Sequence, residues 1–151
     1  MKNKFGLTLF VLISIFSLCL VGCNETKSIK LESDNGIIVE GSLPDGSKLI
    51  ANKIGATDTQ GFLVAELIKD LDYDKFSPIY IHEIFVVKDE KRVQPEDKVT
   101  ITLPLPTTLS DCIIIHIKSD NSKEILTPTI QDGKAIFEVN SFSYFIVASK
   151  K

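Results

Sequence analysis

The chain has 151 residues, of which 44% are hydrophobic, and a formal net charge of −3 at pH 7. This length and hydrophobic content suffice for one globular domain with a buried core. Acidic residues outnumber basic ones by 20 to 17, so the chain lacks the clustered positive charge that binding to nucleic acid or to an anionic surface requires.

The N-terminal segment has the three parts of a signal peptide. Lys2 and Lys4 are followed by the uncharged stretch 5–21, and then by Gly22 and Cys23. A basic start, an apolar middle and small residues before a cleavage point are typical of secretory leaders. A transmembrane helix needs roughly 20 apolar residues, so an uncleaved N-terminal anchor remains the alternative.

The last residues of this segment, Leu20-Val21-Gly22-Cys23, resemble the bacterial lipobox. The resemblance implies that diacylglycerol is attached to the sulfur of Cys23 and that the preceding residues are removed. The mature protein would then be lipid-anchored at the extracytoplasmic face of the cell membrane. Several acyl chains hold a protein firmly, because each buried CH₂ contributes about 0.8 kcal/mol.

The lipobox resemblance divides the chain into a signal peptide (1–22), a lipidated cysteine with a short tether (23–29) and one domain (30–151). Loss of Lys2 and Lys4 would change the net charge from −3 to −5. Cys112 would be the remaining thiol, so no internal disulfide is expected. We expect Cys112 to be a small buried hydrophobic residue.

Short β-branched and aromatic runs, separated by turn residues about every ten positions, predict a β-rich domain. Asp34-Asn35-Gly36 predicts a tight hairpin turn. Between Asp58 and Leu71 the apolar spacing predicts one short amphipathic helix, with a strand over 62–65 as the alternative. The remaining runs predict about eight strands, from the ranges 28–33, 36–40, 48–54, 78–87, 98–103, 112–118, 124–130, 134–139 and 143–149.

Strands of this number and length predict an all-β fold, an Ig-like sandwich of two antiparallel sheets with one short helix. A barrel is the alternative. In the run 98–103, strict alternation predicts that Val99, Ile101 and Leu103 face the core, and Pro104 should end the strand. The stretch 143–149 is a candidate for an exposed edge that could add a partner strand.

The second half of the chain carries a series of motifs: 81–86 (IHEIFV), 93–95 (VQP), 98–106 (KVTITLPLP), 115–117 (IHI) and 135–145, which includes Phe142-Ser143. Over about 41–148, they resemble the Ig-like β-sandwich repeats of Gram-positive cell-surface proteins. The resemblance implies a non-catalytic module that spaces, presents or adheres, and it supplies no catalytic residues. His82 and Glu83 replace the aromatic residue and the aspartate usual in these repeats, and this chain has one copy where the family often has several.

Two histidines, His82 and His116, lie within expected strands. A zinc site usually needs three or four clustered ligands, so strand histidines with local hydrogen bonds are the favoured interpretation and metal ligation is the alternative. The sequence contains no Gly-x-Ser-x-Gly motif and no glycine-rich phosphate loop. We therefore expect no catalytic residues and no cofactor.

Three carboxylates at alternate positions, Asp70, Asp72 and Asp74, match the opening of an EF-hand loop. Lys75 occupies the position that requires glycine, and Ile81 occupies the position of the bidentate glutamate. A solvated acidic loop is favoured over weak calcium binding.

The sequence leaves the partner open. A lipid-anchored module for surface display, adhesion or protein interaction fits the leader and the expected fold. An inhibitor or immunity-type lipoprotein that binds a toxin or a lytic enzyme at the envelope also fits. A carbohydrate-binding module would need exposed aromatic side chains, for which Tyr73, Phe76 and Tyr80 are the candidates, although aromatic residues more often cover a core.

Overall fold

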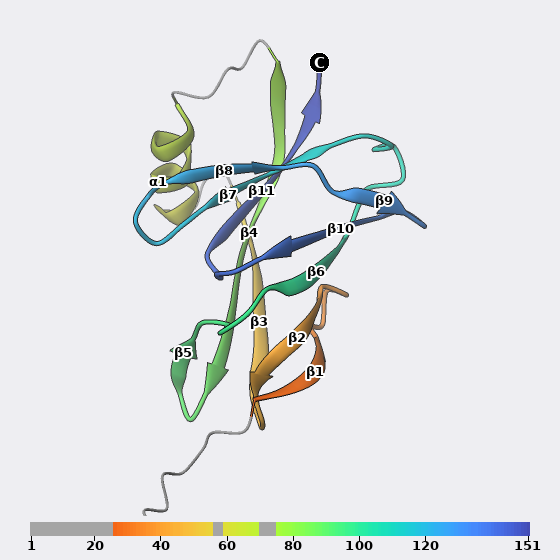
Figure 1. Cartoon of the computed structure of the whole chain (residues 1–151). Coiled ribbons are helices and arrows are strands. Elements are labelled where there is room, and N and C mark those ends of the chain that lie inside the picture. Colours follow the sequence, from red (N-terminus) through yellow and green to blue (C-terminus); the bar gives the residue numbers. More distant parts are fainter. Residues whose placement is uncertain (1–25, 56–58, 70–74) are drawn as a thin grey trace, which may run out of the picture.

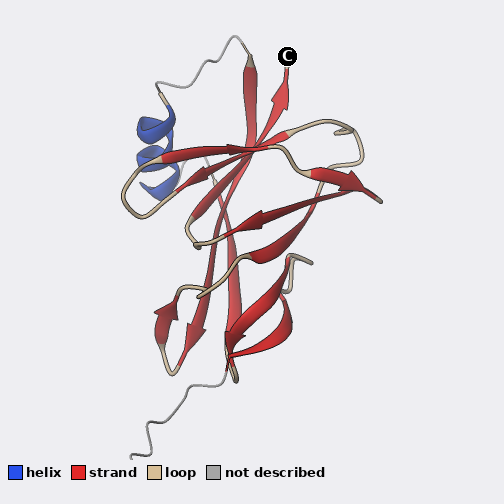
Figure 2. Ribbon diagram, in the orientation of Figure 1, coloured by secondary structure: helices blue, strands red, loops and turns tan. Residues whose placement is uncertain are grey.

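The computed structural model describes residues 26–55, 59–69 and 75–151 (Figure 1). In this part of the chain, strands predominate and α1 (Thr59–Ile68) is the single helix (Figure 2). The strands are β1 (Thr26–Glu32), β2 (Ile38–Pro44), β3 (Lys48–Ile54), β4 (Phe76–Lys88), β5 (Lys91–Val93), β6 (Val99–Pro104), β7 (Ile113–Ile117), β8 (Lys123–Leu126), β9 (Thr129–Gln131), β10 (Lys134–Val139) and β11 (Tyr144–Lys150).

The strands form two antiparallel sheets. Sheet A has the order β1-β2-β6-β10-β9, and sheet B has the order β3-β4-β11-β7-β8, with β5 paired to β4. The predicted all-β sandwich with one short helix is therefore confirmed, with eleven strands among the described residues where about eight were expected. The hairpin turn predicted at Asp34-Asn35-Gly36 is also confirmed, because it lies between the paired strands β1 and β2.

One expected strand, 124–130, is divided between the two sheets. Its first part is β8, which pairs with β7, and its second part is β9, which pairs with β10. Thr127 and Pro128 lie between them. Proline has no N–H for a ladder, and the chain crosses from sheet B to sheet A at this point.

The charged turn after β4 continues into a strand that the sequence pattern did not reveal. Asp89 and Glu90 have φ values of 48° and 63°, as the central residues of a tight hairpin turn require. β5 then returns along β4, with Val93 opposite Val86. Asn-Gly would have indicated such a turn, whereas Asp-Glu does not.

The main hydrophobic core lies between the sheets. Val99, Ile101 and Leu103 of β6 are at most 1% exposed, which confirms their predicted inward orientation. Gly41 of β2 allows the close approach of β6, because a Cβ atom at Gly41 would lie 2.7 Å from Cγ1 of Val99. We call this layer the inner core. Its other fully buried members include Ile37, Val39, Leu43, Ile84, Val86, Ile114, Ala135, Phe145 and Val147.

A second cluster covers the outer face of sheet B, and we call it the outer cluster. It consists of Val64, Ile68, Ile113, Ile115, Ile117, Ile146 and Ala148. Val64 and Ile68 belong to α1, so the helix packs on this face, and the alternative of a strand over 62–65 is wrong.

The position of β11 corrects the expectation of an exposed edge at 143–149. β11 pairs with β4 on one side and with β7 on the other. Four consecutive residues, Phe145 to Ala148, are fully buried, because sheet B is covered on both faces. Among the described strands, the edges are instead β1 and β9 in sheet A and β3, β8 and the short β5 in sheet B. Within the described ranges no helix is long and apolar enough to cross a membrane.

Candidate functional site

Several residues singled out by the sequence lie outside the described residues. These are Cys23, the three carboxylates Asp70, Asp72 and Asp74, and the aromatic Tyr73. Lipid attachment and calcium binding therefore stay predictions. In residues 26–55, 59–69 and 75–151, no group of three or more His, Cys, Asp or Glu side chains could hold a metal ion.

The two histidines lie in one cross-strand row on the inner face of sheet B. His82 of β4 is opposite Phe145 of β11, and Phe145 is opposite His116 of β7. The row ends at Lys53 of β3 on one side and at Glu124 of β8 on the other. Phe145 thus separates the histidines, and the structure does not bring them together as ligands.

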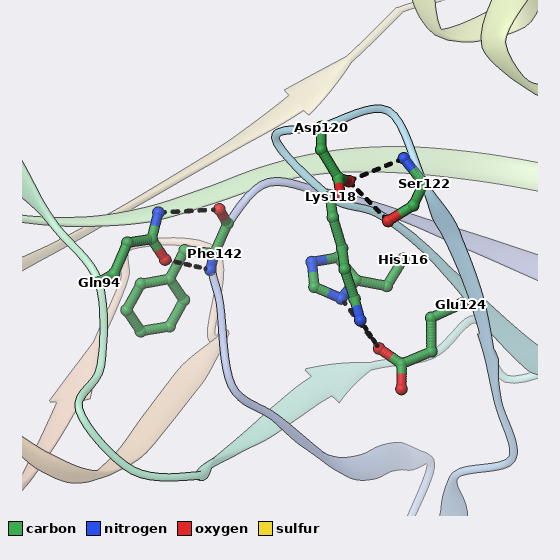
Figure 3. A network of polar contacts seen from close by, with 7 residues as sticks. All are labelled: Gln94, His116, Lys118, Asp120, Ser122, Glu124 and Phe142. Carbon is green, nitrogen blue, oxygen red and sulfur yellow. Dashed lines mark hydrogen bonds and ion pairs between the residues drawn. The ribbon is translucent and has the colours of Figure 1, made fainter.

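His116 is fully buried, and its ring stacks on Phe145 with centroids 4.4 Å apart. Neither ring nitrogen has a hydrogen-bond partner within the described residues. Nδ1 is 3.8 Å from the Glu124 carboxylate, which is too long for a hydrogen bond, and Lys118 binds that carboxylate at 3.0 Å (Figure 3). Burial lowers the pKa of His116 from 6.5 to about 4, and the attraction of Glu124 only partly opposes this effect, so His116 is neutral at pH 7.

His82 is 7% exposed, and its Nδ1 has no hydrogen-bond partner among the described residues. Its ring meets Tyr80 edge-on, with centroids 5.2 Å apart. Burial, followed by repulsion from Lys53, lowers the pKa of His82 to about 4. Two neutral histidines therefore lie on the inner face of sheet B.

Glu83 is buried on the face of β4 opposite the histidine row, with its side chain 5% exposed. Arg92, which is the single arginine of the chain, bonds the Glu83 carboxylate at 2.8 Å. The guanidinium group lies 3.8 Å from the centroid of the Phe85 ring, where cation–π attraction also holds it. This pair explains how an acidic side chain is accommodated in sheet B.

Gln94 connects two distant motifs of the sequence. Its amide nitrogen donates to the Phe142 carbonyl at 3.3 Å, and its amide oxygen accepts from the Phe142 N–H at 2.7 Å (Figure 3). The Gln94 side chain thus satisfies the N–H and C=O of Phe142, just before the start of β11, as a neighbouring strand would do. Phe142 itself is 3% exposed and packs into the inner core.

Cys112 is 1% exposed and free, as predicted for a small buried hydrophobic residue. Burial and the neighbouring Asp111 raise the pKa of its thiol. Lys150 opposes this shift only in part, and a raised thiol pKa disfavours the reactive thiolate.

The candidate aromatic platform is not formed by the two members that the structure describes. Phe76 packs against the outer cluster. Tyr80 packs against the inner core, and its hydroxyl donates to the Pro104 carbonyl at 2.9 Å. The two rings therefore lie on opposite faces of sheet B, and no single flat surface carries both.

One mainly apolar surface recess of the described residues is a groove beside α1, which we call the α1 groove. It has a volume of about 370 Å³ and is open to solvent. Residues at the end of β3 and just after it, in α1 and in β4 line the groove. They are Lys53, Ile54, Gly55, Gly61, Ala65, Ile68, Pro78, Ile79, Tyr80 and Ile81. Lys53 and Tyr80 also line a neighbouring recess with His82 and the prolines Pro104 and Pro106. The sequence patterns did not predict this groove, because its walls come from three separate elements.

A second recess, of about 490 Å³, lies against β6, β10 and the segment between β8 and β9. Its side chains are mainly polar, including Lys98, Glu138, Thr100 and Asn140. Lys98 is paired with Glu138 at 3.6 Å, so its charge is already compensated. This recess has less apolar surface to offer a ligand than the α1 groove.

The chain matches no family model, and neither a curated protein nor a solved structure shows significant similarity to it.

Proposed function

We propose that the protein is a non-catalytic β-sandwich module that is lipid-anchored at Cys23 on the extracytoplasmic face of a bacterial membrane, where it serves in surface display, adhesion or protein interaction. The observation that carries the proposal is the succession of a basic start, an uncharged run and Leu20-Val21-Gly22-Cys23. A folded β-sandwich that begins shortly afterwards fits an exported module.

The start of the domain supports a close attachment to the bilayer. β1 begins at Thr26, inside the stretch 23–29 that the sequence assigned to a tether. Three peptide units join Cys23 to Thr26 and span at most about 11 Å. An acylated Cys23 would therefore keep the first strand at the lipid surface.

Attachment at Cys23 would also orient the sandwich relative to the membrane. Thr26 pairs with Pro44, so the turn between β2 and β3 lies at the end proposed to face the bilayer. α1 lies at the other end of the sandwich (Figure 1). The α1 groove would then be presented away from the membrane, toward other molecules.

We also infer kinship with the Ig-like repeats of Gram-positive cell-surface proteins. The two-sheet sandwich supports this inference, as does the contact between two of the resembling motifs. Gln94 of the Val-Gln-Pro motif holds the backbone of Phe142 in the Phe-Ser motif. Such repeats display or adhere, and we carry that role over to this module as part of the proposal.

Metabolic labelling with an alkyne-bearing fatty acid tests the anchor. We expect label on the full chain expressed with its own leader, complete loss of label in Cys23→Ser, and retention of label in Cys112→Ala. Mass spectrometry of the membrane fraction should give a mature protein that begins at Cys23. An unmodified thiol with residues 1–22 still present would refute the proposal.

A further inference from the structure

Among residues 26–55, 59–69 and 75–151, one stretch of β4 in sheet B lacks a strand partner on the side beside α1. β3 ends at Ile54, which pairs with Ile81 of β4, whereas β4 begins earlier, at Phe76. The stretch Phe76–Tyr80 pairs with β11 on its other side. Among the described residues, no strand pairs with it on the side where β3 has ended, so the backbone of β4 has an open edge there.

The α1 groove runs along this open edge. Residues of β4 form one wall, and the other includes Gly61 and Ala65 of α1, a glycine without a side chain and an alanine with a small one. Ile79 is 45% exposed, so the edge of β4 offers a large apolar side chain to a ligand in the groove. The volume of about 370 Å³ falls within the range of ligand sites, roughly 300–1,000 Å³.

The groove carries an uncompensated positive charge at one end. Lys53 lines both the α1 groove and the recess that contains His82. Its ammonium group lies 5.4 Å from the centroid of the Tyr80 ring, and no carboxylate of the described residues pairs with it. Lys53 is exposed, so its ammonium group makes this end of the groove suited to a carboxylate.

We propose that the α1 groove binds an extended peptide segment of a partner protein, with an apolar side chain between α1 and β4 and a carboxylate at Lys53. Extended peptides add to open sheet edges through main-chain hydrogen bonds and use adjacent pockets for alternate side chains. Pro78 lacks an N–H, so this edge offers fewer donors than a regular strand. The apolar side chain and the carboxylate therefore have to supply most of the selectivity.

The position of the groove favours a protein segment over a lipid from the supporting bilayer. β3 runs from Lys48, next to the β2–β3 turn, to Ile54 at the groove, and seven residues of strand span about 20 Å. The inference deepens the proposed protein-binding role, but it does not depend on acylation of Cys23.

A display library of random octapeptides, selected on the full chain in detergent micelles, tests the inference. We expect enriched peptides to carry apolar residues at alternate positions together with Asp or Glu. Measured by fluorescence anisotropy, their dissociation constants should rise at least about tenfold in Lys53→Glu, because the carboxylate then meets a like charge. Ala65→Trp, which fills the groove, should have a similar effect.

Lys30→Glu is the matched control, since it makes the same charge reversal on the exposed edge strand β1, and it should change the dissociation constants by less than about twofold. No enrichment, enrichment without acidic residues, or unchanged binding by Lys53→Glu would each overturn the inference. Thermal unfolding of each variant identifies misfolding. If Ala65→Trp unfolds at a lower temperature than the unmodified protein, the inference is judged on peptide binding by Lys53→Glu. Peptide selection and fatty-acid labelling of Cys23 give separate readouts, so either proposal can fail while the other stands.

Discussion

The two faces of sheet B are covered in different ways. The inner face is closed by sheet A, a partner of five strands, and the outer face by α1, a helix of ten residues. β11 contributes to both layers, since Phe145 belongs to the inner core and its neighbour Ile146 belongs to the outer cluster. Both side chains are fully buried.

The two layers differ in how much apolar surface they leave exposed to solvent. Among the residues whose side chains the structure describes, the exposed large hydrophobic ones are Leu63 of α1, Ile79 of β4 and Ile125 of β8. Leu63 and Ile79 belong to the two elements that bound the α1 groove, and Ile125 lies opposite Ile115 of the outer cluster. A short helix cannot cover a whole sheet, so the outer layer keeps apolar surface available for a partner, whereas the inner core leaves none.

Replacing adjacent residues of β11 should separate the two layers most clearly. We expect Phe145→Ala to lower the free energy of unfolding by about 4 kcal/mol, because it leaves a large cavity between two rigid sheets. Ile146→Ala should cost about 2 kcal/mol, at the low end for such a change, because α1 can move to fill part of the space. Urea unfolding followed by circular dichroism measures both values.

The comparison of inner and outer layers would be contradicted by equal losses, or by a larger loss in Ile146→Ala. Ser149→Ala, on the partly exposed end of the same strand, is the control and should change the free energy of unfolding by less than about 0.5 kcal/mol.

Alternation along one strand was enough to predict its part of the inner core. The pattern of β6 placed Val99, Ile101 and Leu103 correctly, because each position depends only on its neighbours in sequence. The outer cluster was harder to predict, since strands covered on both faces read as continuous apolar runs, as in 113–117, and periodicity does not say what covers the second face. The central position of β11 was missed for the same reason.

The candidate sites show the same limit. His82 and His116 could be named from the sequence, but their separation by Phe145 depends on the registers of three strands. The α1 groove combines β3, α1 and β4, and its open edge exists because β3 ends at Ile54 while β4 begins at Phe76. Strand lengths of this kind follow from packing, which local residue preferences do not specify.

The buried histidines make the inner core sensitive to acid. Both have a pKa near 4 in the folded protein and about 6.5 when unfolded. Between these values the unfolded state binds more protons, so stability is present above about pH 6.5 and is lost as the pH falls toward 4. The protonation preference of each histidine should lower the free energy of unfolding by about 2 kcal/mol when the pH falls from 7 to 5.

Urea unfolding at pH 7 and pH 5 tests this dependence. In His116→Leu, the loss between the two pH values should be smaller by about 2 kcal/mol than in the unmodified protein. Glu124→Gln removes the carboxylate that favours protonation of His116, so its loss should be at least as large as that of the unmodified protein. An unchanged pH dependence in His116→Leu would show that His116 is not protonated on unfolding in this range.

The smallest expected effect concerns the outer face of sheet B where Arg92 covers Glu83. Arg92→Gln should lower the free energy of unfolding by about 1.5 kcal/mol, because it leaves a buried carboxylate without its charged partner. Solvent reaches the guanidinium group of Arg92, whose side chain is 60% exposed. The loss should therefore be smaller than for a fully buried pair.

Two further variants serve as controls. Lys91→Gln removes the neighbouring exposed charge and should lower the free energy of unfolding by less than about 0.5 kcal/mol. Arg92→Lys should recover part of the loss, since the ammonium restores the charge without the planar contact to Phe85. Equal losses of unfolding free energy in Arg92→Gln and Lys91→Gln would show that the buried Glu83 carboxylate does not need its charged partner.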